Sequence, residues 1–225
     1  MGTNKVPSIK FLQPLAIRLT HWLNAVLLLG MIASGIQIFG AYPAFAERGA
    51  MFCCYPFDGF RFPEAVRLGG WLAGGLQWHF FLMWFFVLNA FLYVVYLFAS
   101  GEWRRRLFSP RDVRGAWQMQ LYYLRVRKEK PAYEMYNGLQ KLSYTAVLAL
   151  GALSVLTGLA LWKPVSLPFL TAAAGGYAWA RFWHFLIVWA FVGFLVIHIF
   201  MTLVVDREST RSMIVGAYRE RADET

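Results

Sequence analysis

Residues 182–205 of this 225-residue chain read FWHFLIVWAFVGFLVIHIFMTLVV, an apolar run whose ionisable side chains are His184 and His198. A run of this length crosses the roughly 30 Å of hydrocarbon in a bilayer as an α-helix. An ionisable side chain inside such a span is expensive and marks a candidate functional site. The two histidines are fourteen residues apart, which in a helix is a rise of about 21 Å and a rotation of about 320° beyond whole turns. Both rings should therefore point to nearly the same face, at two depths.

Three further segments are comparably long and apolar, over residues 15–39, 71–100 and 139–162. The chain is 59% hydrophobic and only 15% charged, whereas a soluble domain carries about a quarter charged residues. These features predict an all-α integral membrane protein, a bundle of four transmembrane helices that forms a single membrane-embedded domain over residues 1–225. The net charge of +10 does not indicate nucleic-acid binding, because the cations cluster between the apolar spans.

Lysine and arginine are distributed unevenly between the two sides of these spans. Seventeen lie at the N-terminus with its first helical turn, in the loop between the second and third spans, and in the C-terminal tail, against five in the other two loops. Cytoplasmic flanks are enriched in Lys and Arg, so we expect both termini in the cytoplasm. We expect no cleavable signal peptide, because the apolar run from Leu15 is long enough to span the membrane. The basic central loop is expected to be solvated, with a short amphipathic helix around residues 113–125, or to dock a cytoplasmic partner.

The other two histidines, His21 and His79, lie alone on the first and second spans. With the termini inside, His21 and His198 fall at the cytoplasmic depth and His79 and His184 at the outer depth. Imidazole is a common axial ligand of haem iron, so four histidines at two matched depths predict two haem b groups, each held by two histidines. Two ligands per iron leave no open coordination position, which favours electron transfer. The alternative is that the histidines only hydrogen-bond between helices of a haem-free membrane scaffold.

Arg18 lies one turn before His21, where it is either a partner for a haem propionate or an ordinary cationic anchor at the membrane surface. Cys53 and Cys54 are adjacent and lack the spacing of iron–sulfur, zinc or c-type haem sites. They form either a vicinal disulfide or two ordinary thiols. Glycines interrupt the bulky faces of the spans, where they either permit close helix contact or face a flat macrocycle: Gly30, Gly35, Gly151, Gly158 and Gly193.

Several motifs resemble those of the dihaem b-type cytochrome membrane subunits of nickel–iron hydrogenases, formate dehydrogenases and thiosulfate reductases. RLTHW at residues 18–22 is similar to the R-x-x-H-W opening of that family, and the histidine spacing over 184–198 is similar to its fourth helix. YNGLQK at 136–141 resembles the start of the third helix in formate dehydrogenase subunits, and STRSMIVGAYR at 209–219 resembles the C-terminal segment of hydrogenase cytochromes. The resemblance implies a location in the bacterial inner membrane, with one histidine of the fourth helix serving each haem.

The same resemblance implies a quinone pocket near the His21/His198 haem, formed by polar residues where the third span begins: Tyr136, Asn137, Gln140 and Lys141. Asn137 and Gln140 also have the spacing of a helix capping box, so a structural role is the alternative. The implied function is that of an electron-transport subunit of an oxidoreductase complex. It would carry electrons between the quinone pool and a periplasmic partner, which is a molybdopterin enzyme or a nickel–iron hydrogenase.

A rival function is that of a self-sufficient quinone reductase of the same architecture, which oxidises superoxide at the periplasmic mouth. Such an enzyme needs a cationic funnel outside the membrane to attract its anionic substrate. The outer loops offer five cations, diluted by Glu47, Asp58 and Glu64: Arg48, Arg61, Arg67, Lys163 and Arg181.

Overall fold

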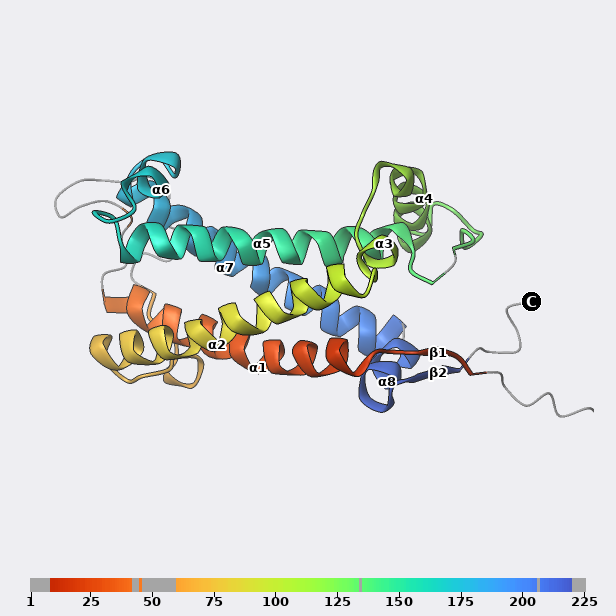
Figure 1. Cartoon of the computed structure of the whole chain (residues 1–225), viewed down its shortest axis with the longest axis horizontal. Helices are drawn as coiled ribbons and strands as arrows, with labels where there is room; N and C mark the ends of the chain where they lie inside the picture. The colour runs from red at the N-terminus through yellow and green to blue at the C-terminus, as the bar shows by residue number, and fades with distance from the viewer. Residues whose placement is uncertain (1–8, 42–44, 46–59, 134, 206, 220–225) are drawn as a thin grey trace, which may run out of the picture. The chain divides into compact units, whose positions relative to one another are not determined.

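The computed structural model describes residues 9–41, 45, 60–133, 135–205 and 207–219, so Arg48 and the pair Cys53 and Cys54 lie outside the described residues. Within this part of the chain, four helices are long and apolar enough to cross a membrane (Figure 1). They are α1 (Leu15–Ala41), α2 (Leu72–Ala99), α5 (Gly138–Trp162) and α7 (Tyr177–Phe200), and α7 continues into the π-helical turn η3 (Met201–Val205). The predicted all-α class with four spanning helices is confirmed, and the chain is a multi-pass membrane protein.

The first three helices agree with the predicted spans to within two residues at each end, but α7 begins at Tyr177, five residues before the predicted 182. Arg181 suggests a flank, yet it lies inside the helix. A long cationic side chain near a helix end can reach the interface, and Tyr and Trp are favoured there, as Tyr177 and Trp179 illustrate. At the other end, the Thr202 hydroxyl donates to the His198 carbonyl oxygen at 2.9 Å, where the helix changes from α to π geometry.

The contacts divide the chain into two compact units. The first holds residues 1–43, 57–93 and 192–225, and the second holds residues 44–56 and 94–191. Besides α1 and parts of α2 and α7, the first unit contains the short helices η1 (Glu64–Val66) and α8 (Arg207–Val215). It also contains a two-stranded antiparallel sheet, β1 (Ile9–Leu12) with β2 (Ala217–Arg219). Apolar runs do not predict this pairing of the two ends of the chain.

In the first unit, two side chains of α1 hold the end of α8. Arg18 Nε donates to the Met213 carbonyl at 3.2 Å, and a second guanidinium nitrogen donates to the Ile214 carbonyl. Trp22 Nε1 also donates to the Met213 carbonyl, at 3.1 Å. A cation at a helix C-terminus pairs with carbonyl groups that have no partner within the helix and complements the helix dipole. Gly216, with φ of +87°, ends α8 in the left-handed conformation that glycine favours at this position.

The second unit contains α3 (Trp103–Arg106), η2 (Pro110–Asp112), α4 (Val113–Tyr123), α5 and α6 (Pro168–Ala173), with the first part of α7. The expected amphipathic helix around 113–125 is confirmed as α4. Figure 1 shows α4 lying across the start of α5, and the two helices contact each other. At Gly138 a Cβ atom would lie 2.5 Å from the Ala116 nitrogen and 2.7 Å from the Asp112 carbonyl oxygen. Only glycine allows this approach of the two backbones.

Gly138→Ala should therefore destabilise the second unit, because the new methyl group meets backbone atoms that cannot move aside independently. Overpacking of this kind typically costs about 1–3 kcal/mol. The measurement is the thermal unfolding midpoint of the detergent-solubilised protein, followed by circular dichroism. Gly115→Ala in α4 is the matched control, since a Cβ there meets nothing within 4 Å and alanine favours a helix by up to about 1 kcal/mol. Equal midpoints for the two variants would contradict the close contact.

Candidate functional site

His21 on α1 and His198 near the end of α7 face each other within the first unit. Their ring centroids are 6.0 Å apart, and the ring planes are inclined by 57°. Metal–imidazole bonds of about 2 Å each place two ligating nitrogens about 4 Å apart, so ring centres at 6.0 Å match two ligands of one metal ion. The structure thus brings together the pair that was predicted for the cytoplasmic depth.

Aromatic side chains flank both rings of this pair. Phe194, one helical turn before His198, stacks on it with ring centroids 5.4 Å apart and an interplanar angle of 15°. Trp22 meets His21 edge to face at 5.3 Å. The Nδ1 atom of His21 is buried, and no described residue provides it with a hydrogen-bond partner. An unpaired buried nitrogen is costly and calls for an explanation, and a place in an incomplete ligand set would supply one.

Asn89 on α2 supports the backbone beside His21, a contact that the sequence pattern did not predict. The asparagine is 4% exposed, and its Nδ2 donates to the Thr20 carbonyl oxygen at 2.9 Å. Thr20 directly precedes His21, so this bond fixes α2 against the part of α1 that carries the ring. The sequence signal for Asn89 is a lone amide in an apolar span, where polar side chains commonly join helices.

His79 on α2 also lies in the first unit, against α1. Its Nδ1 is 3.0 Å from the hydroxyl oxygen of Ser34, which is fully buried. The next residue, Gly35, faces the same ring, because a Cβ atom there would lie 3.6 Å from His79 Cε1. The imidazole of His79 therefore contacts α1 at a hydroxyl residue and the glycine that follows it, Ser34 and Gly35.

His184 on α7 has the same surroundings in the second unit. Its Nδ1 is 2.9 Å from the Thr157 hydroxyl oxygen on α5. The following glycine, Gly158, would place a Cβ atom 3.4 Å from His184 Cε1. Because His79 and His184 belong to different units, their pairing on one haem stays a prediction.

The five glycines of the spans fall into three groups. Gly30 permits close helix contact, since a Cβ atom there would lie 2.6 Å from a methyl carbon of Leu82. Gly35 and Gly158 face the histidine rings. A Cβ atom at the remaining two would meet nothing within 4 Å, and the macrocycle alternative stays open for them: Gly151 and Gly193.

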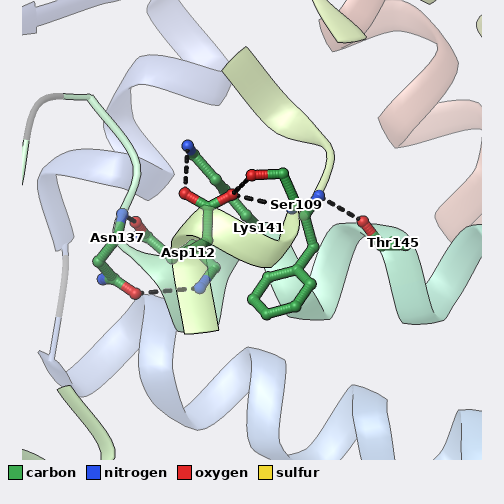
Figure 2. A network of polar contacts seen from close by, with 7 residues as sticks. Ser109, Asp112, Asn137, Lys141 and Thr145 are labelled. Carbon is green, nitrogen blue, oxygen red and sulfur yellow. Dashed lines mark hydrogen bonds and ion pairs between the residues drawn. The ribbon is translucent and has the colours of Figure 1, made fainter. Parts of the chain in front are cut away.

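The residues proposed for the quinone pocket lie at the start of α5, in the second unit (Figure 2). Asn137 Oδ1 accepts a hydrogen bond from the Gln140 backbone N–H, and Gln140 Oε1 accepts one from the Asn137 backbone N–H, both at 3.0 Å. The capping box that the spacing suggested is therefore present. It uses the two amide oxygens and leaves the two amide NH₂ groups outside the box.

Lys141 joins α5 to the segment that precedes α4. Its ammonium donates to Asp112 Oδ1 at 2.8 Å, and Asp112 Oδ2 accepts from the backbone N–H and the hydroxyl of Ser109, at 2.9 and 2.8 Å (Figure 2). Burial alone would raise the pKa of the Asp112 carboxyl, but the hydrogen bonds from Lys141 and Ser109 outweigh it and lower this pKa below its ordinary value. Asp112 therefore stays ionised at neutral pH. It links Lys141 to Ser109 as a hydrogen-bond acceptor and does not serve as a proton donor.

Tyr136, which directly precedes Asn137, contacts Arg106 and Tyr144. The guanidinium of Arg106 lies over its ring at 5.0 Å from the centroid, and Tyr144 meets it edge to face at 5.4 Å. Arg106 is 5% exposed and donates to Glu102 at 2.9 Å. All four predicted quinone residues thus lie in one cluster of the second unit, whereas His21 and His198 lie in the first. Proximity of this cluster to a haem remains a prediction.

The histidine pair fits a haem better than it fits a metal ion held by protein alone. No group of three or more His, Cys, Asp or Glu side chains that could hold a metal occurs among the described residues. A closed protein site normally needs three or four such ligands. Two facing imidazoles instead suit an iron whose remaining ligands come from a macrocycle. His21 and His198 are the residues that would hold it.

Comparison with known proteins agrees with this chemistry. The family described as prokaryotic cytochrome b561 matches residues 12–216. The putative protein-methionine-sulfoxide reductase subunit YedZ1 of Azospira oryzae is 34% identical over 197 residues, which are 87% of this chain and 92% of that protein. The probable Ni/Fe-hydrogenase B-type cytochrome subunit of Cupriavidus necator is 24% identical over 225 residues, covering 92% of this chain and 85% of the relative.

No solved structure matches the chain. The family match covers most of the chain and includes all four histidines. Family and relatives together bear out the b-type cytochrome resemblance and an electron-transport role within an oxidoreductase complex, and the family implies haem b. The chain belongs to the prokaryotic cytochrome b561 family.

Proposed function

We propose that this chain is the dihaem membrane subunit of an inner-membrane oxidoreductase and carries electrons between a periplasmic partner and the quinone pool. The observation that carries the proposal is the pair His21 and His198, facing each other at 6.0 Å from two apolar helices. His79 and His184, each with a hydroxyl partner on Nδ1, are the proposed ligands of the second haem. Bound haem b supplies one-electron redox chemistry.

The protein's own task at the His21/His198 pair is to keep two neutral imidazoles in place. A protonated imidazole cannot ligate a metal, and apolar surroundings disfavour the charged form of a histidine. The stacked ring of Phe194 restricts His198, and the hydrogen bond from Asn89 fixes the backbone before His21. The pair is thereby held ready for ligation.

The cluster at the start of α5 is the proposed quinone site. Quinone carbonyl oxygens accept hydrogen bonds, so the site must supply donors. The amide NH₂ groups of Asn137 and Gln140 are donors that the capping box does not use. Tyr136 adds a phenolic hydroxyl, and Lys141 holds the cluster together through Asp112. A helix cap and a quinone contact are therefore compatible, since they use opposite ends of the same amides.

For the partner, we propose a periplasmic molybdopterin reductase that acts on oxidised methionine. Of the two relatives described, the more similar is named as a subunit of a protein-methionine-sulfoxide reductase. Reduction of a sulfoxide consumes two electrons and two protons, so electrons would flow from quinol outward through this chain. A nickel–iron hydrogenase, which the second relative's name suggests, would send electrons in the opposite direction.

Haem content is the direct test of the proposed function. Detergent-purified protein should hold two low-spin b haems per chain, measured by pyridine haemochrome assay and a reduced-minus-oxidised spectrum. His198→Ala and His79→Ala should each lose one haem, and the two losses should affect different spectral components. A single haem in the unmodified protein would refute the proposal of two haems. A colourless protein made with adequate haem supply would favour the alternative of a haem-free membrane scaffold.

Asn137→Ser separates the two roles of Asn137. Serine is a good N-cap residue, so the thermal midpoint should change little, whereas Asn137→Ala should lose about 1 kcal/mol of stability. Serine lacks the amide donor, so the rate at which a quinol analogue reduces the haems should fall at least several-fold in both variants. If a quinol analogue reduces the haems of Asn137→Ser at the normal rate, Asn137 serves only as a helix cap.

The proposed partner is tested by affinity purification of the full chain from its native membranes. A molybdenum-containing protein should co-purify, and methionine sulfoxide should reoxidise the quinol-reduced haems in that complex. The hydrogen-driven alternative is measured in the same preparation, since reduction of the haems by H₂ would reassign the partner to a hydrogenase.

A further inference from the structure

The carbonyl groups around Ser34 favour an acceptor role for its hydroxyl toward His79. Its oxygen lies 2.8 Å from the Gly30 carbonyl and 3.1 Å from the Met31 carbonyl, both of which accept its proton. A hydroxyl has one proton to donate. With the proton on either carbonyl, the oxygen, 3.0 Å from His79 Nδ1, accepts a hydrogen bond from Nδ1–H. This arrangement gives His79 the Nδ1–H tautomer, with its lone pair on Nε2.

Thr157 does the same for His184 on a different pair of helices. Its hydroxyl donates to the Leu153 carbonyl at 2.7 Å, with the Ser154 carbonyl at 3.2 Å, so its proton is already used. With this proton position, the contact with His184 Nδ1 at 2.9 Å is again a hydrogen bond donated by Nδ1–H. The two arrangements share their hydroxyl geometry and the glycine that follows each hydroxyl residue.

His21 differs from these two histidines, because its buried Nδ1 has no hydrogen-bond partner among the described residues. Among the described residues, both ligands of the proposed outer pair thus have a hydroxyl partner on Nδ1, whereas Nδ1 of His21 is left available to bind the metal itself. An acceptor on the non-ligating nitrogen fixes the tautomer and orientation of a metal-bound imidazole and raises its basicity. A more basic ligand favours the oxidised metal.

We propose that Ser34 and Thr157 are positioning residues that fix the Nε2 lone pairs of His79 and His184 for haem ligation and lower the reduction potential of the haem that these histidines hold. The inference rests on the proposed dihaem function. The change it concerns is a one-electron reduction of the iron, in which the Nδ1 proton stays on each imidazole. The simpler alternative is that the hydroxyls serve only their own helices, since Ser and Thr commonly bond to carbonyls one turn back.

The experiment is a potentiometric titration of both haems in the purified full chain, with haem content and the electron paramagnetic resonance spectrum of the oxidised protein. Thr157→Val should raise the midpoint of one haem so that its oxidised-to-reduced ratio at fixed potential falls by about tenfold, which is 59 mV for one electron. Ser34→Ala should shift the same haem less, because a backbone hydrogen bond between His79 and Met31 remains. The other haem should keep its midpoint.

Two sets of variants exclude a merely structural effect. Ser154→Ala removes another hydroxyl of α5, which donates to the Gly151 carbonyl at 2.7 Å. Both haem midpoints should stay unchanged in this variant. Thr157→Ser and Ser34→Thr keep the acceptor oxygen and should restore the wild-type midpoint and resonance spectrum. If a hydroxyl-free variant fails to assemble, Thr157→Cys replaces it, and its weakly accepting thiol should give a smaller shift in the same direction.

The possible outcomes distinguish a failure of the positioning role of Ser34 and Thr157 from a failure of the proposed dihaem function. Two haems with unchanged midpoints in Thr157→Val and Ser34→Ala would overturn the inference and leave the dihaem function intact. Shifts in two different haems would overturn the shared site for His79 and His184. An unmodified protein without two haems would refute the proposed function itself.

Discussion

The structure depends on one constraint, which is that a polar side chain within hydrocarbon must find its partner inside the protein. Water is absent there, and an unpaired buried donor or acceptor costs about 1–3 kcal/mol. His79 and His184 meet this constraint through hydroxyl groups of neighbouring helices. Asn89 meets it through a backbone carbonyl. Each such bond joins two apolar helices at a defined height and rotation, which apolar packing alone specifies poorly.

The spanning helices could be predicted from sequence because their determinant is local. A run of about twenty apolar residues must satisfy its backbone within itself and so becomes a helix. The pairing of His21 with His198 followed from the same rule, since helix length and direction set the depth of each ring. The start of α7 was misplaced because Arg181 carries a charge that the interface accommodates. Hydropathy cannot separate a cation at an interface from one in a loop.

The contacts that shape the candidate site could not be predicted, because they join residues far apart in the chain. Ser34 and Thr157 look like ordinary small residues of apolar spans until the partner helix is in place. The hydrogen bonds from Arg18 and Trp22 to the end of α8 likewise form only when α1 and the C-terminal segment meet. The contacts of Arg18 and Trp22 with Met213 join two stretches that resemble a known family, residues 18–22 and 209–219. The resemblance of each stretch did not predict that the two would meet.

At the start of α5, the side chains of the proposed quinone site also have structural roles. A capping box consumes the oxygen of Asn137 and the oxygen of Gln140, and a carboxylate consumes one proton donor of Lys141. An amide has separate donor and acceptor ends, and an ammonium has three protons. The fold therefore fixes these side chains in place while leaving donors for a carbonyl ligand. One end of each group holds the side chain in place, and the other end stays available for the proposed ligand.

Arg18 contacts the end of α8, and its pairing with a haem propionate stays a prediction. Its guanidinium has five N–H donors in a fixed plane, and the end of α8 takes donors from two of its nitrogens. The carbonyl groups there carry partial negative charge, so they orient the cation without neutralising it. A full positive charge with remaining donors is thereby held one turn before His21. Because the side-chain entropy of Arg18 is already lost to the fold, binding of an anion to its remaining donors would not have to pay this cost again.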